Sequence, residues 1–174
     1  MDNKKLYVDM VPYKAWYSNL RNELAEGEWD KIRKSVYKKT NYCCEICNAK
    51  SERLEAHERW KFDVNTKTQT LVNIEGLCSA CHEVTHIGLA SVRGNTNRAI
   101  THMMKVNRTT KDECAREIVE SVNRVYKLNN YQWNKLDLTY LLDNYNSYLS
   151  NETKEKIQKL KEGKIERNFY NKER

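Results

Sequence analysis

Two pairs of cysteines carry the strongest chemical signal in this sequence. Cys44 and Cys47 form one C-x2-C pair, and Cys78 and Cys81 form a second. Two residues between paired cysteines close a tight turn that presents two thiolates to one cation, and four thiolates around Zn²⁺ make a closed tetrahedral site. We therefore expect these four residues to hold a structural zinc ion. Cys43 remains an alternative to Cys44 as the first ligand.

Three histidines and one asparagine lie within this cysteine framework or directly after it. His57 and Asn73 fall between the two pairs, and His82 follows the second pair directly. His86 is four residues further on, so both imidazoles would share one face of a helix and could grip one ion. The spacing therefore predicts that these two imidazoles could hold a second ion.

The order of these residues resembles the HNH endonuclease family, also called the ββα-metal nucleases. The resemblance is most specific over residues 43–87, and a broader similarity to small phage and bacterial HNH proteins covers residues 6–143. The strings that carry it are LYVDMVP, AWYSNLR, WDKIRKSVY, CEIC, HERW, LCSACHEVTHIGLA and KLDL.

The resemblance implies an enzyme, a metal-dependent endonuclease that hydrolyses phosphodiester bonds in DNA. His57 would be the general base, a role that suits imidazole because its pKa lies near neutrality. Asn73 would hold that histidine or its loop in position. His82 and His86 would hold Mg²⁺ or another divalent metal, which stabilises the transition state and the leaving oxygen. The expected catalytic residues are thus His57, Asn73 and His82.

One position departs from the pattern of the family. Many HNH enzymes carry Asp or His directly before the base, as a metal ligand, and this sequence has Ala56 there. Glu58 would point to the opposite face of a strand, so a bulge would be needed to bring in Glu58 or Glu55. Otherwise the ion relies on His82 and His86 with water and phosphate. A third alternative is that metal binding is weak, and that the zinc module only binds nucleic acid or protein, for example as a phage protein acting on a host system.

The composition is compatible with a polyanionic partner. The 174 residues include 31 Lys and Arg and 24 Asp and Glu, which gives a net charge of +7 and a pI of about 9.0. The charge favours a phosphate-bearing partner, and the resemblance implies that this partner is DNA. No apolar run fits a signal peptide or a membrane span, so we expect a cytoplasmic protein with no membrane partner. The resemblance places it in a bacterial or phage-infected cell.

Five basic residues gather on one expected helix, over residues 28–39. This stretch is either a solvated helix face or a surface that contacts phosphates, and its basic residues are Lys31, Arg33, Lys34, Lys38 and Lys39.

Two further residues with reactive side chains are expected to be structural. Cys114 lies in an apolar helical pattern, and His102 has no partner in the motif.

The secondary structure expected around these residues indicates an α+β fold that is mostly α. Residues 54–63 and 69–72 are expected to form a β-hairpin, and a helix should follow over about 82–91. A knuckle, hairpin, second knuckle and helix in this order describe a treble-clef zinc module, the ββα-metal core of the HNH family. Other elements are expected at residues 13–24, 28–39, 95–106, 110–128 and 150–163 as helices, and at 136–138 as a short strand.

The same pattern predicts four segments along the chain. An N-terminal helical segment, residues 1–42, should pack on the HNH core at residues 43–92. A helical accessory region, 93–149, follows, and residues 150–174 form a basic helix and tail. This last segment is expected to be loosely attached or to bind a protein partner.

Overall fold

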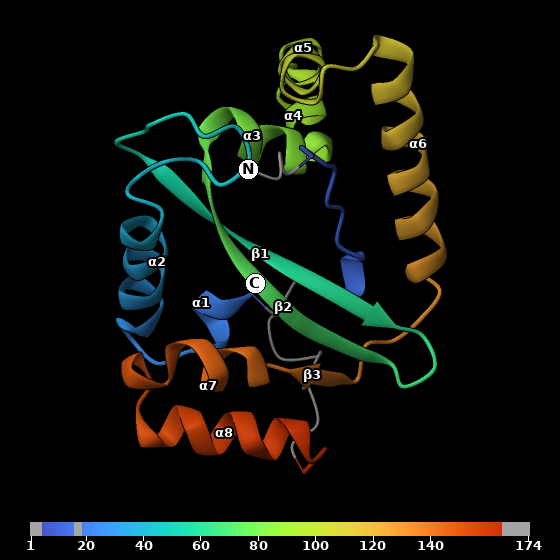
Figure 1. The fold of residues 1–174 in the computed structure, drawn as a ribbon. Coiled ribbons are helices and arrows are strands. Elements are labelled where there is room, and N and C mark those ends of the chain that lie inside the picture. Colours follow the sequence, from blue (N-terminus) through green and yellow to red (C-terminus); the bar gives the residue numbers. More distant parts are fainter. Residues whose placement is uncertain (1–4, 16–18, 165–174) are drawn as a thin grey trace. The chain divides into compact units, whose positions relative to one another are not determined.

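The protein has an α+β fold with one small sheet. The computed structural model describes residues 5–15 and 19–164 (Figure 1). The sheet has the order β1-β2-β3, with strands at Leu54–Asp63, Thr68–Cys78 and Lys135–Asp137. The α+β class expected from the sequence is therefore confirmed.

The chain forms two compact units. The first unit contains the N-terminal residues up to Met10 together with Arg33–His57 and Ile74–Lys127. The second unit contains Val11–Ile32, Glu58–Asn73 and the chain from Leu128 onward. Strands β1 and β2 each contribute one part to each unit, and both cysteine pairs lie in the first.

The first unit is built around the helices that follow β2. Helix α3 packs against α4 and α5, and its buried core includes Leu54, Leu77, Val84 and Met103. The short α3 does not need high intrinsic helix propensity, because packing of an apolar face stabilises most helices in proteins. The helices of this unit are α3 (Ser79–Thr85), α4 (Ile87–Val92), α5 (Thr96–Asn107) and α6 (Lys111–Leu128).

The hairpin differs from its prediction in one strand. β1 has the expected bounds, whereas β2 does not end near residue 72 but continues to Cys78. The sequence between these points contains Asn73, Glu75 and Gly76, residue types that are depleted in strands. Burial overrides this propensity, because Ile74 and Leu77 are 3% and 0% exposed.

The helix expected over residues 82–91 is wrong in its bounds. It begins earlier, at Ser79, and divides into α3 and α4, which meet at His86. The backbone of His86 has φ −101° and ψ 45°, outside the α-helical range. The N–H of His86 still donates to the carbonyl of His82 at 3.1 Å, so these two residues remain one helical turn apart.

The second unit packs short helices beside β3. β3 runs parallel to β2 with Thr68 opposite Lys135, and Trp133 and Leu141 are fully buried. The single helix expected over residues 13–24 is wrong for the described residues, which form a 3₁₀ turn and a one-turn helix; Trp16 lies outside them. The elements of this unit are η1 (Tyr13–Ala15), α1 (Leu20–Glu23), α7 (Thr139–Tyr145), η2 (Asn146–Tyr148) and α8 (Asn151–Lys161).

Helix α8 is anchored rather than loosely attached. It buries Ile157 and Leu160, and its start is tied to Glu28, the first residue of α2 (Glu28–Lys39). The Glu28 carboxylate accepts hydrogen bonds from the Ser150 N–H at 2.6 Å and from the Thr153 hydroxyl at 2.8 Å. Burial opposes ionisation, but these hydrogen bonds lower the pKa of Glu28 on balance. Residues 165–174 of the expected basic tail lie outside the described residues.

Candidate metal centres

The first cysteine pair lies on a tight turn in front of β1. The N–H of Cys44 donates to the carbonyl of Ala49, and the N–H of Asn48 donates back to the carbonyl of Cys44, both at 2.9 Å. Asn48 adopts the left-handed conformation with φ +57°, which asparagine tolerates better than most residues. The turn therefore holds Cys44 and Cys47 on one side of a closed loop.

The second cysteine pair lies where β2 becomes α3. Cys78 is the last residue of β2, and Cys81 is in the first turn of α3. Two hydrogen bonds join the turn of the first cysteine pair to β2. The N–H of Glu45 donates to the carbonyl of Gly76 at 3.0 Å, and the Glu45 carboxylate accepts from the N–H of Gly76 at 2.9 Å.

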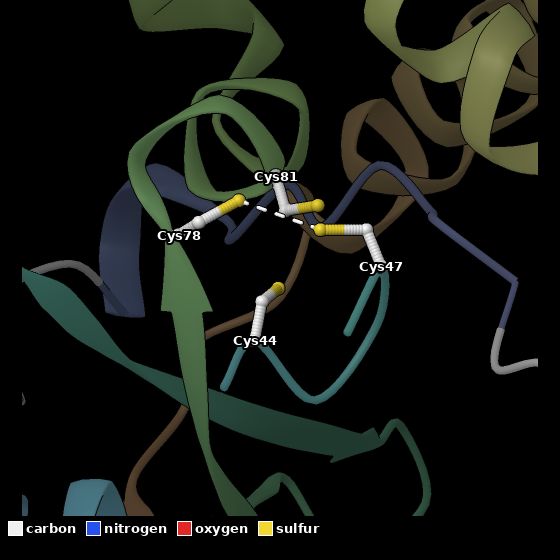
Figure 2. A group of neighbouring side chains, drawn as sticks. All are labelled: Cys44, Cys47, Cys78 and Cys81. Carbon is white, nitrogen blue, oxygen red and sulfur yellow. Dashed lines mark hydrogen bonds between the residues drawn. The ribbon is translucent and has the colours of Figure 1, made fainter. Parts of the chain in front are cut away.

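The two pairs converge in a four-thiol group, the cysteine cluster: Cys44, Cys47, Cys78 and Cys81. Their sulfur atoms all lie within 4.8 Å of one another, and Figure 2 shows the four side chains pointing toward one another. The sulfurs of Cys47 and Cys78 are 3.7 Å apart. A Zn–S bond of about 2.3 Å in a tetrahedron separates two sulfurs by ~3.8 Å. The cluster therefore fits a metal ion such as zinc.

Burial and crowding act on the thiols of the cysteine cluster. Cys44 and Cys81 are 1% and 0% exposed. Hydrogen bonds with Cys78 and Cys81 lower the pKa of the Cys44 thiol, while burial raises the pKa of Cys47 to about 11. A thiol of high pKa keeps its proton until a cation displaces it, so metal binding here is coupled to proton release.

The remaining cysteines lie outside this cluster. The sulfur of Cys43 faces the carbonyl of Asn41 at 3.7 Å, so Cys44 and not Cys43 is the member of the first pair that joins the cluster. Cys114 is 1% exposed in the core of the first unit, as expected. All six cysteines are free thiols.

His102 has a partner that sequence reasoning missed. Its Nε2 lies 3.3 Å from the sulfur of Cys81, and burial lowers the pKa of its imidazole. A neutral imidazole N–H next to a ligating thiolate can donate a hydrogen bond to it, as outer-shell groups do in metal sites. No local spacing could have shown this contact, because α5 brings His102 to the cluster from 21 residues away.

The three histidines of the motif converge in a second group, the histidine cluster: His57, His82 and His86. A ring nitrogen from each lies within 4.8 Å of one from each of the others. The ring centroids of His82 and His86 are 4.5 Å apart. The ring centroid of His57 lies 5.6 Å from that of His82 and 5.0 Å from that of His86. β1 supplies His57, which is 4% exposed. His82 lies on α3, and His86 lies between α3 and α4.

Two carboxylates contact this cluster. A carboxylate oxygen of Glu55 is 2.9 Å from Nδ1 of His82, and one of Asp9 is 3.2 Å from Nε2 of His57. Glu55 is two residues before His57 on β1, so both side chains point to the same face of the strand. Of the two glutamates weighed from the sequence, Glu55 therefore contacts a cluster histidine.

Glu58 has its contacts in the second unit. One oxygen accepts from the N–H of Leu20 at 3.0 Å, and the other accepts from the indole N–H of Trp60 at 3.2 Å. Both contacts are structural, because they satisfy donors of the backbone and of an indole ring. Glu58 therefore already serves two donors of the second unit.

The electrostatics of the histidine cluster favour neutral rings at His82 and His86. Burial, followed by the neighbouring His57 and His82, lowers the pKa of His86 to about 4. Burial also lowers the pKa of His82, against the opposing effect of Glu55. Neutral imidazole is the form that binds metal ions, so the cluster fits a divalent cation held by nitrogen.

The structure places Asn73 in the part of β2 that belongs to the second unit. Its side-chain oxygen accepts a hydrogen bond from the Tyr140 hydroxyl at 2.8 Å.

The five basic residues expected to contact phosphate all lie on α2. Arg33 is half-buried, and the exposed members are Lys31, Lys34, Lys38 and Lys39.

Within the residues that the structure describes, none of the helices has the length and apolarity needed to cross a membrane. Comparisons of the chain with protein-family models, with curated proteins and with solved structures found no match.

Proposed function

We propose that this protein is a metal-dependent endonuclease that hydrolyses phosphodiester bonds in DNA. In this proposal the cysteine cluster holds a structural zinc ion, and residues 43–87 form a treble-clef module of the HNH type. The observation that carries the proposal is the convergence of His57, His82 and His86 beside the cysteine cluster. Three imidazoles with adjacent carboxylates are a donor set that a structural zinc module does not need.

The roles of the histidines follow from their neighbours. His82 and His86 bind the divalent ion, and the contact of Glu55 with Nδ1 of His82 leaves Nε2 of that ring as the ligand atom. When bound, the ion supplies Lewis-acid stabilisation of the phosphate and of the leaving oxygen. His57 accepts the proton of the attacking water through the ring nitrogen that does not face Asp9.

One observation favours a different role for His57. Its ring lies about as close to His82 and His86 as these rings lie to each other, an arrangement that also suits a third metal ligand. The affinity of the histidine cluster for Mn²⁺ separates the two roles. A base can be removed with little loss of affinity, whereas removal of a ligand weakens binding strongly.

The exposed lysines of α2 supply the contact with substrate in this proposal. Lys34, Lys38 and Lys39 lie on the last turns of a helix that begins at Glu28. Contacts of this type neutralise phosphates without reading the sequence of bases. They therefore support binding to DNA and imply no sequence preference.

A second candidate function is binding without hydrolysis. His57 is 4% exposed, and a general base must meet a water molecule and a phosphate. Ala56 also occupies the position where many HNH enzymes carry a metal ligand. Both features are compatible with a zinc-stabilised module that binds nucleic acid or protein and has lost the reaction.

A plasmid-nicking assay tests the proposal. Supercoiled DNA is incubated with the protein and Mg²⁺, Mn²⁺ or Ni²⁺, and the wild type is compared with His57→Ala and with the control Cys43→Ser. We expect nicking by the wild type and the control, and a loss of about 10²-fold or more in His57→Ala. Equal nicking by all three, or DNA binding without nicking under every metal, would overturn the enzyme proposal.

A further inference from the structure

The N-terminal arm, Lys5–Asp9, is a segment outside the helices and strands whose residues alternate in burial. Leu6 and Val8 are 0% and 3% exposed and belong to the core of the first unit. Tyr7 and Asp9 each follow one of these buried residues in the chain and are half-buried. Both contact His57.

Hydrogen bonds from three helices fix the backbone of this arm. The side chain of Asn107 pairs with both the N–H and the carbonyl of Leu6, each at 2.7 Å. The N–H of Val8 donates to Glu117 at 3.3 Å. The N–H of Asp9 donates to the carbonyl of Thr85, at the end of α3, at 3.0 Å.

The Asp9 side chain is therefore held in place from both directions. Its backbone is attached to the helix that carries His82, and its neighbour Val8 is packed in the core. The carboxylate is 12% exposed and lies 3.2 Å from Nε2 of His57. The ring of Tyr7 also lies near this histidine, with 6.2 Å between ring centroids, and its hydroxyl donates to the buried Glu75 at 2.5 Å.

We propose that Asp9 is a positioning residue for His57. An ionised carboxylate only accepts hydrogen bonds, so it selects the tautomer of His57 that carries its proton on Nε2. The lone pair then resides on Nδ1, which is the nitrogen left for proton transfer or for a cation. The use of Nδ1 in hydrolysis rests on the proposed function, whereas the choice of tautomer does not.

This arrangement gives His57 a carboxylate partner from outside the motif. Ala56, directly before His57, has no carboxylate. The Asn73 side chain, which was expected to position His57, accepts a hydrogen bond from Tyr140 in the second unit. Asp9 comes from 48 residues upstream of His57.

The tautomer can be measured directly by ¹H–¹⁵N NMR of the histidine rings. The sample is the 174-residue protein with zinc at the cysteine cluster and no second metal, at pH 8. We expect the Nε2–H pattern for His57 in the wild type and in the control Glu120→Gln, which changes an exposed acid of α6 to its amide. In Asp9→Asn the side chain keeps its shape but can also donate, so we expect the Nδ1–H form to become populated.

Asp9→Ala provides a second variant with no hydrogen-bonding group. We expect a mixture of both tautomers there, and a nicking rate lowered by ~10–100-fold, the usual cost of removing an outer-shell carboxylate. Unchanged ring ¹⁵N shifts of His57 in both Asp9 variants would overturn the inference, whatever their activity. A wild type that shows the Nε2–H tautomer but never nicks DNA would instead overturn the proposed function and leave the role of Asp9 intact.

Discussion

The cysteine cluster and the histidine cluster share the junction between β2 and α3 but differ in donor chemistry. Cys81 and His82 are adjacent in the chain, and one step along a helix turns the side chain by ~100°. Cys81 is 0% exposed, whereas His82 is 23% exposed and contacts Glu55, which is 46% exposed. The same short helix therefore supplies a buried thiol to one cluster and a partly exposed imidazole to the other.

This difference teaches how each cluster can be used. Four thiolates complete the coordination of zinc and leave no position for a substrate. Two or three imidazoles leave positions open, and the carboxylates around them orient the rings. We therefore expect loss of a thiol to affect folding, and loss of an imidazole to affect chemistry.

The largest expected effect comes from breaking the cysteine cluster. In Cys81→Ser we expect loss of the tightly bound zinc and a fall in Tm of roughly 10 °C, because metal binding energy in such sites is folding energy and ~3 kcal/mol corresponds to that shift. Thermal unfolding and metal analysis measure both quantities. Cys43→Ser is the matched control and should retain its zinc and its Tm. Equal Tm values for the two variants would refute a structural role for the cluster.

The next effect separates chemistry from folding. His82→Ala and His86→Ala should each lower nicking by at least ~100-fold and weaken the binding of Mn²⁺, because one of few ligands is lost. Tm should change by no more than about 2 °C, since neither ring is needed by the cysteine cluster. Calorimetric titration with Mn²⁺ and thermal unfolding provide the two readouts. A loss of stability as large as that of Cys81→Ser would show that the two clusters are not distinct in role.

A smaller effect tests the outer contact of the cysteine cluster. His102→Ala removes the imidazole that lies 3.3 Å from the sulfur of Cys81, so zinc should transfer to a competing chelator ~10-fold faster. Thr101→Ala, which changes the exposed neighbour on α5, is the control. Identical transfer rates for both variants would mean that the contact does not strengthen the site.

The smallest expected effect concerns delivery of substrate, which only the histidine cluster requires. Replacing Lys34 and Lys38 with glutamine should lower the slope of log affinity for DNA against log salt by about 1 to 2, because each phosphate contact contributes ~0.9. The same change at Lys159 and Lys161 on α8 should leave the slope unaltered. If only the α8 pair alters the slope, α2 is not the DNA-binding surface.

Local spacing was sufficient to predict the parts of the molecule that are themselves local. The C-x2-C pairs, the strand at Leu54–Asp63 and the helix at Glu28–Lys39 depend on residues within a few positions of each other, and the structure has them with the expected bounds. The extension of β2 to Cys78 was missed, because burial of Ile74 and Leu77 overrode the residue preferences there. The division of the helix at His86 was also missed.

Contacts over long separations were beyond such patterns. Asp9 meets His57 across 48 residues and His102 meets Cys81 across 21, and no periodicity connects them. One pattern bears on Asp9: the apolar residues Leu6 and Val8, which are buried, alternate with more polar neighbours in the N-terminal arm. It predicts a two-faced segment but does not say which element the polar face meets.

Selective removal of one metal tests the central claim most directly, namely that one cluster keeps its ion for the fold and the other uses its ion for hydrolysis. The protein is treated with a mild chelator until one zinc per chain remains, and plasmid nicking is then followed before and after adding Mg²⁺ or Mn²⁺. We predict an intact fold with no nicking after treatment, and recovery of nicking on addition in the wild type but not in His82→Ala. Nicking that persists without added ion, or that returns equally in His82→Ala, would contradict the account.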